Sequence, residues 1–172
     1  MQEATGPGRA GDEPCDAASS PLQAEMRARV IALAFGGDVQ RFEEFVDVLR
    51  SALPPGTGAV IRGSAVSGFR HEDGAPFDAD GPGTSDLDLS LTGDKVRECF
   101  TVTGFYVPWV HSIPLSDEHP KVAPPLVPLR ERLTGIAGRP VNIQSTRDFV
   151  TQLRGDVLGQ PYLVLLEHHE PS

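Results

Sequence analysis

SDLDLSLTG, residues 85–93, alternates polar and apolar side chains with strict period two. Every second position of the run is a leucine (Leu87, Leu89 and Leu91), and the positions between them are polar. Period two is the spacing of a β-strand whose two faces meet different surroundings. The run therefore predicts a strand with its leucines in the core and with Asp86 and Asp88 together on the opposite face.

A second strand is predicted just upstream, where GAVIRG occupies residues 58–63. This run is short and apolar, as buried strands are, and it continues into Ser64 and a series of small residues. Gly63 lets the backbone come close to a ligand, and the turn can begin a short helix whose free N–H groups face an anion. The Ser64 hydroxyl adds a donor. Arg62 either contacts a phosphate here or is an exposed residue at the strand end.

The rest of the chain predicts alternating helices and strands. Helical patterns cover 21–35, 39–53, 126–138 and 147–159, the last with Thr146 as its N-cap, and strand-like runs cover 140–144 and 161–167. Residues 100–125 have no consistent period. Leu22 and Val39 are expected on apolar helix faces, and Tyr106 and Trp109 in the core or in a pocket wall. The order of elements predicts an α/β (α+β) domain with a small mixed β-sheet flanked by helices.

Length and charge set the domain organisation and the position of the acidity. A chain of 172 residues suits one domain, placed at 21–167, with tails at 1–20 and 168–172. The net charge is −9, and the segment from His71 to Asp94 contributes −7 of it, with seven carboxylates and no lysine or arginine. The acidity argues against a protein that coats nucleic acid nonspecifically. Its concentration beside the Gly-Ser turn indicates a pocket that requires a cation.

The sequence also predicts where the protein resides. Cys15 and Cys99 are too few for a disulfide framework, and no apolar run has the length of a membrane span. The N-terminal residues lack the apolar segment of a secretory signal. We therefore expect a cytoplasmic protein without a membrane partner.

Asp86 and Asp88 indicate a metal site. Two carboxylates on one strand face repel each other unless a cation lies between them. A hard divalent ion, Mg²⁺ or Mn²⁺, removes this repulsion and also binds triphosphate oxygens. Phosphoryl or nucleotidyl transfer needs an anion-binding turn, a carboxylate pair and such a metal. An EF-hand starting at Asp78 is excluded, because its positions five and twelve would be Pro82 and Leu89.

The two motifs together resemble the signature of the DNA polymerase β-type nucleotidyltransferase superfamily. The residues that match its Gly-Ser turn and its Ser-Asp-x-Asp-apolar strand are Gly63, Ser64, Gly68, Ser85, Asp86, Asp88 and Leu89. The resemblance covers 38–94, with weaker support to residue 145. It implies a nucleotidyltransferase-like domain in which Asp86 and Asp88 are catalytic and bind the metal.

The same resemblance implies the ligands and the reaction. Gly63 and Ser64 would hold the phosphates of a nucleoside triphosphate such as ATP, with Ser85 and Arg62 as further candidates. A nucleoside monophosphate would pass to a hydroxyl of a protein, an RNA or a small molecule, with release of pyrophosphate. A partner protein could supply the specificity for the acceptor.

The chain departs from the family pattern at the third metal ligand. The family has a carboxylate on a later strand, whereas the position between Val141 and Ile143 is Asn142. An amide oxygen can bind a metal, but an amide is neither a base nor an anion. The nearest carboxylates that could substitute are Asp78, Asp80 and Asp94. The alternative function is therefore a catalytically degenerate nucleotide-binding or protein-interaction module, whose acidic surface docks a basic partner.

A second departure is the insert 69–84, which has sixteen residues where a short turn is usual. The insert is too long for a plain hairpin loop. We expect either a flap that faces the substrate or an additional cation site. In the flap, Phe69 and Phe77 would be anchors, and Arg70 and His71 would meet phosphate.

Overall fold

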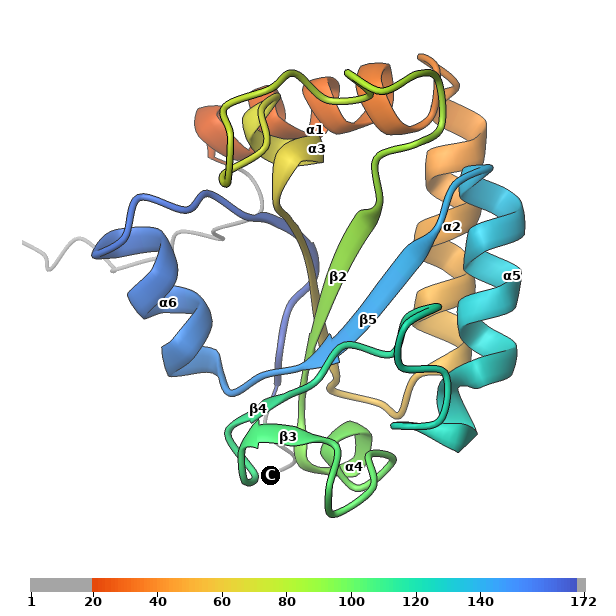
Figure 1. The fold of residues 1–172 in the computed structure, drawn as a ribbon, viewed down its shortest axis with the longest axis vertical. Helices are drawn as coiled ribbons and strands as arrows, with labels where there is room; N and C mark the ends of the chain where they lie inside the picture. Colours follow the sequence, from red (N-terminus) through yellow and green to blue (C-terminus); the bar gives the residue numbers. More distant parts are fainter. Residues whose placement is uncertain (1–19, 170–172) are drawn as a thin grey trace, which may run out of the picture.

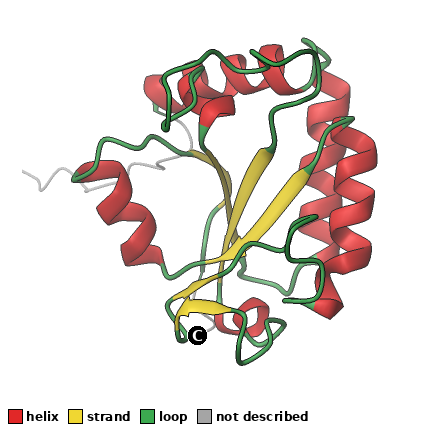
Figure 2. Cartoon of the chain, viewed as in Figure 1, coloured by secondary structure: helices red, strands yellow, loops and turns green. Residues whose placement is uncertain are grey.

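The computed structural model describes residues 20–169, which form an α+β fold (Figures 1 and 2). The helices are α1 (Pro21–Ala34), α2 (Val39–Ala52), α3 (Ser64–Ser67), α4 (Asp94–Arg97), α5 (Val127–Ala137) and α6 (Asp148–Asp156), with a 3-10 helix, η2 (Pro124–Leu126), before α5. The strands are β1 (Gly58–Arg62), β2 (Leu87–Thr92), β3 (Phe105–Val107), β4 (His111–Ser112), β5 (Val141–Ser145) and β6 (Leu163–Leu166). The predicted fold class is confirmed.

Four strands form a mixed sheet in the order β5-β2-β1-β6. β1 is antiparallel to both β2 and β6, and β2 is parallel to β5. The register aligns apolar positions across three strands, because Leu89 lies opposite Ile61 on one side and opposite Ile143 on the other. The polar positions of the same strands consequently share the other face. β3 and β4 form a separate hairpin within 100–125.

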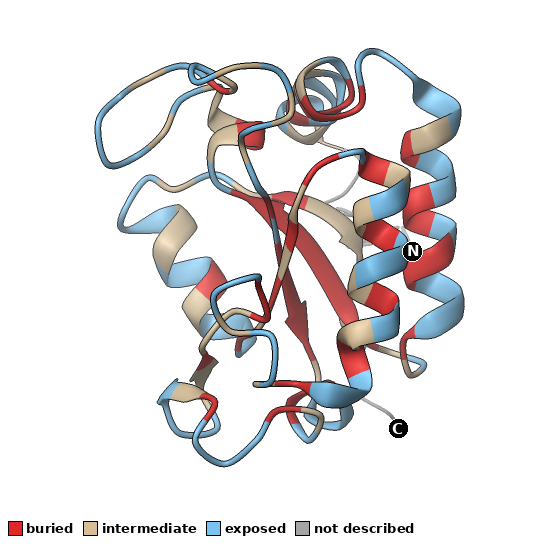
Figure 3. Ribbon diagram, turned by 45° about the vertical axis from the view of Figure 1, so that its right-hand side comes forward, coloured by how far each residue is buried: buried red, intermediate tan, exposed pale blue. Residues whose placement is uncertain are grey.

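The core lies between one face of the sheet and helices α1, α2 and α5 (Figure 1). Leu87, Leu89 and Leu91 are at most 1% exposed, as their period predicts. Burying each of them contributes about 2 kcal/mol to folding. Figure 3 shows buried stripes on α2 and α5 and a buried sheet beside them. α6 lies on the other side of the sheet, and of its residues only Thr151 is buried.

Three local predictions about helices are wrong. Leu22 is 62% exposed and Val39 is 52% exposed, because each lies in the first turn of its helix, where the apolar stripe has not yet reached the core. Thr146 does not cap α6, which begins at Asp148 without a side-chain cap. Thr146 is instead fully buried, and its hydroxyl is 2.8 Å from Nδ1 of His111.

The hairpin β3–β4 carries aromatic side chains on the surface. Tyr106 is 61% exposed and Trp109 is 54% exposed, so the prediction that they lie in the core is wrong. Trp109 is in the connection between β3 and β4, with a φ of 59°, and its ring packs near that of Phe105. The reason is topological, since this hairpin is a sheet of its own rather than part of the main sheet.

Both predicted tails fall largely outside the described residues, which exclude 1–19, with Cys15, and 170–172. At the first boundary, the Ser20 hydroxyl caps α1 by accepting the Gln23 N–H. At the second, the His169 N–H donates to the Gly56 carbonyl. Cys99 is a free cysteine. Between residues 20 and 169, no helix is both long enough and apolar enough to cross a membrane.

Candidate functional site

The end of β1 forms the Gly-Ser turn that the sequence predicts. Gly63 has a φ of 77°, in the left-handed region, and the single-turn helix α3 follows it directly. A Cβ at this position would lie 2.8 Å from Oδ2 of Asp88, closer than side chains tolerate. Only glycine therefore allows the turn to lie against the carboxylate, and this contact joins the two sequence motifs in space.

Asp86, Asp88 and Asn142 converge on the polar face of the sheet. Asn142 on β5 lies in register with Asp88 on β2. Its Nδ2 donates to Oδ2 of Asp86 at 3.0 Å and to Oδ1 of Asp88 at 3.2 Å. Both carboxylates therefore lie about one hydrogen-bond length from a single point, which is the arrangement that a shared cation needs.

Electrostatics at Asp88 also favour a cation. Surrounding protein atoms partly desolvate this carboxyl and raise its pKa, although Asp88 is exposed to solvent. The hydrogen bond from Asn142 and the charge of Arg62 oppose the increase, whereas the charges of Asp86 and Glu72 add to it. The carboxylate is thus crowded by like charge and only partly compensated. A divalent ion would stabilise its ionised form.

One cavity of about 320 Å³ brings the predicted site together. Its lining residues are Gly63, Ser64, Arg70, His71, Glu72, Asp80, Thr84, Ser85, Asp86 and Asp88. The Gly-Ser turn, the carboxylate pair and the insert thus share one space. Two other predicted residues, Arg62 and Asn142, do not line this cavity.

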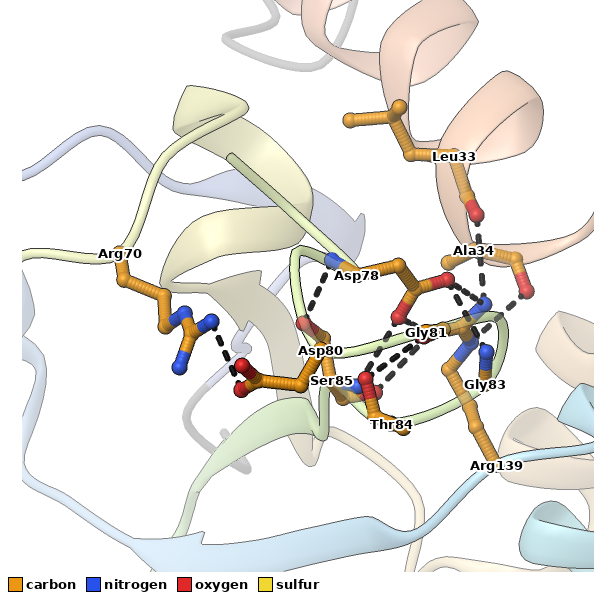
Figure 4. A network of polar contacts seen from close by, with 10 residues as sticks. All are labelled: Leu33, Ala34, Arg70, Asp78, Asp80, Gly81, Gly83, Thr84, Ser85 and Arg139. Carbon is orange, nitrogen blue, oxygen red and sulfur yellow. Dashed lines mark hydrogen bonds and ion pairs between the residues drawn. The ribbon is translucent and has the colours of Figure 1, made fainter. Parts of the chain in front are cut away.

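The insert is fixed to the start of β2 by a buried ion pair (Figure 4). Arg139, two residues before the start of β5, places two nitrogens 2.9 and 3.1 Å from the two carboxylate oxygens of Asp78. The same carboxylate accepts the backbone N–H groups of Ser85 and Gly83. Arg139 also donates to the Ser85 carbonyl. These bonds set the path of the chain one residue before Asp86.

Ser85 itself has a structural partner. Its hydroxyl oxygen accepts the Asp78 N–H at 2.8 Å, so part of its hydrogen-bonding capacity is used to close the insert. It still lines the cavity, as the prediction of a phosphate-binding residue requires. The binding role itself stays a prediction.

The insert forms one wall of the cavity. Arg70 pairs with Asp80 at 2.8 Å, and both line the cavity together with His71. Phe77 is a buried anchor, 8% exposed, as predicted. Phe69 is 59% exposed, so its prediction as an anchor is wrong, because its side chain is left outside the short turn that the insert makes between it and Pro76.

The geometry narrows the choice of a third metal ligand. Asp78 is occupied by Arg139, and Asp94 lies beyond the opposite end of β2, where it pairs with Arg97. Asp80 lines the cavity. Among residues 20–169, no three acidic, histidine or cysteine side chains are grouped as a metal-ligand set.

The donor set at the convergence point fits Mg²⁺ or Mn²⁺. It consists of Asp86, Asp88 and Asn142, whose amide presents its oxygen when rotated by half a turn about its last bond. All three then offer oxygen ligands, which hard divalent ions prefer.

Two residues of the site are absent from the sequence predictions. Arg139 has no motif around it, and its role depends on contacts 61 residues away in the chain. Gln160 accepts a hydrogen bond from Arg62 at 3.1 Å across 98 residues. Neither position carries a periodic or spacing signal, so only the folded chain reveals them.

Comparison of the chain with family models, curated proteins and solved structures gives no match. What the fold and the site define is an α+β protein whose mixed sheet presents paired carboxylates beside a Gly-Ser turn in an acidic cavity.

Proposed function

We propose that the protein is a metal-dependent nucleotidyltransferase of the DNA polymerase β type. It transfers a nucleoside monophosphate from a nucleoside triphosphate to an acceptor hydroxyl. The observation that carries the proposal is the shared cavity, in which the Gly63–Ser64 turn meets the Asp86 and Asp88 carboxylates. An anion-binding turn beside a carboxylate pair is what nucleotidyl transfer requires.

Each part of the cavity has a role in this reaction. Gly63 and Ser64 bind triphosphate oxygens through the exposed turn, and Arg70 and His71 face the same space from the insert. Asp86 and Asp88 hold Mg²⁺ or Mn²⁺. The metal, when bound, neutralises phosphate charge and orients the in-line attack.

The bonds change at the α-phosphorus of the nucleotide. The acceptor oxygen forms a bond to this phosphorus, and the bond from the phosphorus to the bridging oxygen of the β-phosphate breaks. Pyrophosphate leaves with that electron pair. The hydroxyl proton passes to water, because the Asn142 amide is not a base.

The test is transfer of label from each of the four α-³²P ribonucleoside triphosphates, with Mg²⁺ or Mn²⁺, to pooled RNA, protein and small molecules. Transfer is expected, and Asp86→Asn combined with Asp88→Asn should abolish it. Glu44→Gln is the matched control, because this carboxylate is exposed on α2, on the other side of the sheet. Absence of transfer to every pool with both metals would overturn the proposal.

A second candidate function is a degenerate module that binds a nucleotide without turnover, and Asn142 is the observation that favours it. Its amide donates hydrogen bonds to both carboxylates, and an amide cannot serve as the third carboxylate of the family pattern. Calorimetry separates the two functions. Metal-dependent nucleotide binding that Asp86→Asn abolishes, without transfer, would support the module, and absence of both would leave only a protein-interaction role.

A further inference from the structure

Arg62 lies in a row of polar side chains that crosses three strands. The register places Arg62 on β1 opposite Asp88 on β2, and Asp88 opposite Asn142 on β5. Side chains directly opposite each other across a sheet share a face. Arg62 therefore lies on the same face as the carboxylate pair, turned away from the leucine core.

Burial leaves this arginine with unused hydrogen-bonding capacity. Arg62 is only 9% exposed, and its Nε is buried without a hydrogen-bond partner in the part of the chain that the structure describes. One terminal nitrogen donates to Oε1 of Gln160, which fixes the direction of the guanidinium. A buried donor without an acceptor is costly, so an acceptor from outside the chain would stabilise this side chain. The Nε atoms of Arg70 and Arg97 are buried in the same way, but those two arginines also pair with carboxylates.

A second arginine, Arg154 of α6, is joined to Arg62 through Gln160, whose side chain accepts from Arg62 and whose backbone N–H donates to the Arg154 carbonyl at 2.9 Å. Seven arginines form ion pairs with carboxylates: Arg27, Arg29, Arg50, Arg70, Arg97, Arg130 and Arg139. Within residues 20–169, the other five arginines have no carboxylate oxygen within 4 Å: Arg41, Arg62, Arg132, Arg147 and Arg154. Of these five, Arg62 and Arg154 are the two that Gln160 joins. In a chain of charge −9, two such arginines on one side of the sheet indicate a place kept for an anion.

His111 shows that the two arginines act on the same region. Burial, followed by the charges of Arg154 and Arg62, lowers the pKa of His111 to about 4. The two arginines also repel each other. Burial, followed by the charge of Arg154, lowers the pKa of Arg62 to about 10. Arg62 remains charged at neutral pH, while His111 is neutral and adds no positive charge to this region.

This cationic group is distinct from the cavity that holds the Gly-Ser turn. Neither Arg62 nor Arg154 lines that cavity, although Asp88 does. The carboxylate pair thus lies beside an anion-binding turn, which lines the cavity, and beside Arg62, which does not. When a metal occupies Asp88, its charge no longer compensates Arg62, and the need for another anion grows.

We propose that Arg62 and Arg154 bind a phosphate group of the second substrate, the acceptor. A phosphate dianion offsets two guanidinium charges and accepts several N–H bonds, which a peptide hydroxyl cannot do. The acceptor is then a nucleotide, free or at the end of an RNA, whose ribose hydroxyl lies near its own phosphate. The assignment of this phosphate to the acceptor rests on the proposed function, whereas the phosphate site itself does not.

The phosphate site is tested without nucleotide or metal. Inorganic phosphate is titrated into ¹⁵N-labelled protein, with sodium chloride at equal ionic strength as the reference. The Nε–H resonance of Arg62 should shift and saturate, and Arg62→Gln or Arg154→Gln should weaken binding about tenfold or more. Arg132→Gln, which removes the same charge from the exposed side of α5, should leave binding unchanged.

Further variants keep this test decisive. If Arg62→Gln does not fold, Arg62→Lys takes its place in the test. This variant retains the charge and should keep part of the phosphate affinity. Equal phosphate affinity in wild type and in folded Arg62→Gln would overturn the inference. It would also fail if Arg70→Gln, rather than Arg62→Gln, removed binding, because phosphate would then occupy the Gly-Ser cavity.

The acceptor class is tested by competition among three acceptors in the transfer assay: a nucleoside, its 5′-monophosphate and a short RNA with a free 3′ end. Preference for either phosphorylated acceptor supports the inference and shows whether the bound phosphate belongs to a free nucleotide or to an RNA end. Equal use of the nucleoside overturns the inference. Arg62→Gln should raise KM for the phosphorylated acceptor about tenfold and leave KM for the triphosphate unchanged. Absence of transfer overturns the proposed function alone, since the phosphate titration decides the site independently.

Discussion

Replacement of Arg139 by glutamine should loosen the insert and lower stability while leaving the sheet intact. Arg139 bridges three separate parts of the chain, since it binds Asp78, the Ser85 carbonyl and the carbonyls at the end of α1. Its guanidinium also lies 4.6 Å from the centre of the Phe77 ring. Glutamine can replace at most two of these contacts.

The magnitude follows from burial. The Arg139 side chain is 8% exposed and that of Asp78 is 20% exposed, so removal of one partner leaves a largely desolvated charge. Breaking a buried pair in this way costs about 3–5 kcal/mol. Asp78 keeps the N–H groups of Gly83 and Ser85, which argues for the lower end, about 3 kcal/mol. In a domain of this size, that loss lowers Tm by roughly 6–12 °C.

Urea denaturation of four proteins measures the effect: wild type, Arg139→Gln, Asp78→Asn and the double variant. The sum of the two single losses of unfolding free energy should exceed the loss in the double variant by about 1–3 kcal/mol, because both substitutions remove the same interaction. Arg132→Gln is the control and should change the free energy of unfolding by less than about 0.5 kcal/mol. A loss below about 1 kcal/mol in Arg139→Gln, or additive single effects, would refute the reasoning.

Acid titration gives an independent readout of the same pair. Burial tends to raise the pKa of Asp78, but hydrogen bonds from Arg139, Ser85 and Gly83 and the Arg139 charge outweigh it and lower the pKa from 3.8 to about 2. The unfolded chain binds the proton first, so the stabilisation is present above about pH 4 and is lost as the pH falls to about 2. Asp78→Asn should remove this part of the acid sensitivity, and an unchanged acid profile would contradict the assignment.

Three further predictions follow from single contacts. Asn142→Asp replaces a donor by a third carboxylate, so calorimetry should show Mg²⁺ affinity increased about tenfold or more and melting should show lower stability without metal. Gly63→Ala forces a Cβ to 2.8 Å from Oδ2 of Asp88 at a φ of 77°, and urea denaturation should show a loss of about 1–3 kcal/mol. Leu89→Ala should cost about 3 kcal/mol, whereas Leu22→Ala, at a 62% exposed position, should change stability by less than about 0.5 kcal/mol.

The sheet was predictable because its signals are local. Period two in SDLDLSLTG places three leucines in the core, and the short apolar run before Gly63 gives its neighbour. Residues 100–125 gave no such signal, since the hairpin there has only three- and two-residue strands and an aromatic surface. Leu22 and Val39 failed for a related reason, because periodicity assigns a helix face but not how far along the helix the core extends.

The site was predictable only where motifs carry it. Gly63, Ser64, Asp86 and Asp88 follow from spacing within two short segments, and the cavity contains all four. Arg139 and Arg154 come from other parts of the chain, and tertiary packing brings Arg139 to Asp78 across 61 residues and Arg154 to the region of Arg62 and His111. Propensities and spacing rules describe only residues that are close in sequence and do not predict such contacts. The roles of Arg139 and Arg154 are therefore visible only in the structure.

Asn142 gives the three-strand row its particular character. Its amide donates one hydrogen bond to each of the two carboxylates at the convergence point. A metal must displace those donors and turn the amide oxygen inward, so binding pays for two lost hydrogen bonds. An aspartate at this position would remove that cost but would leave three carboxylates to repel one another in the empty site. The row Arg62–Asp88–Asn142 therefore places a positive charge and a hydrogen-bond donor on the two strands beside Asp88, and in the proposed reaction a triphosphate would contribute the further oxygens that a bound cation needs.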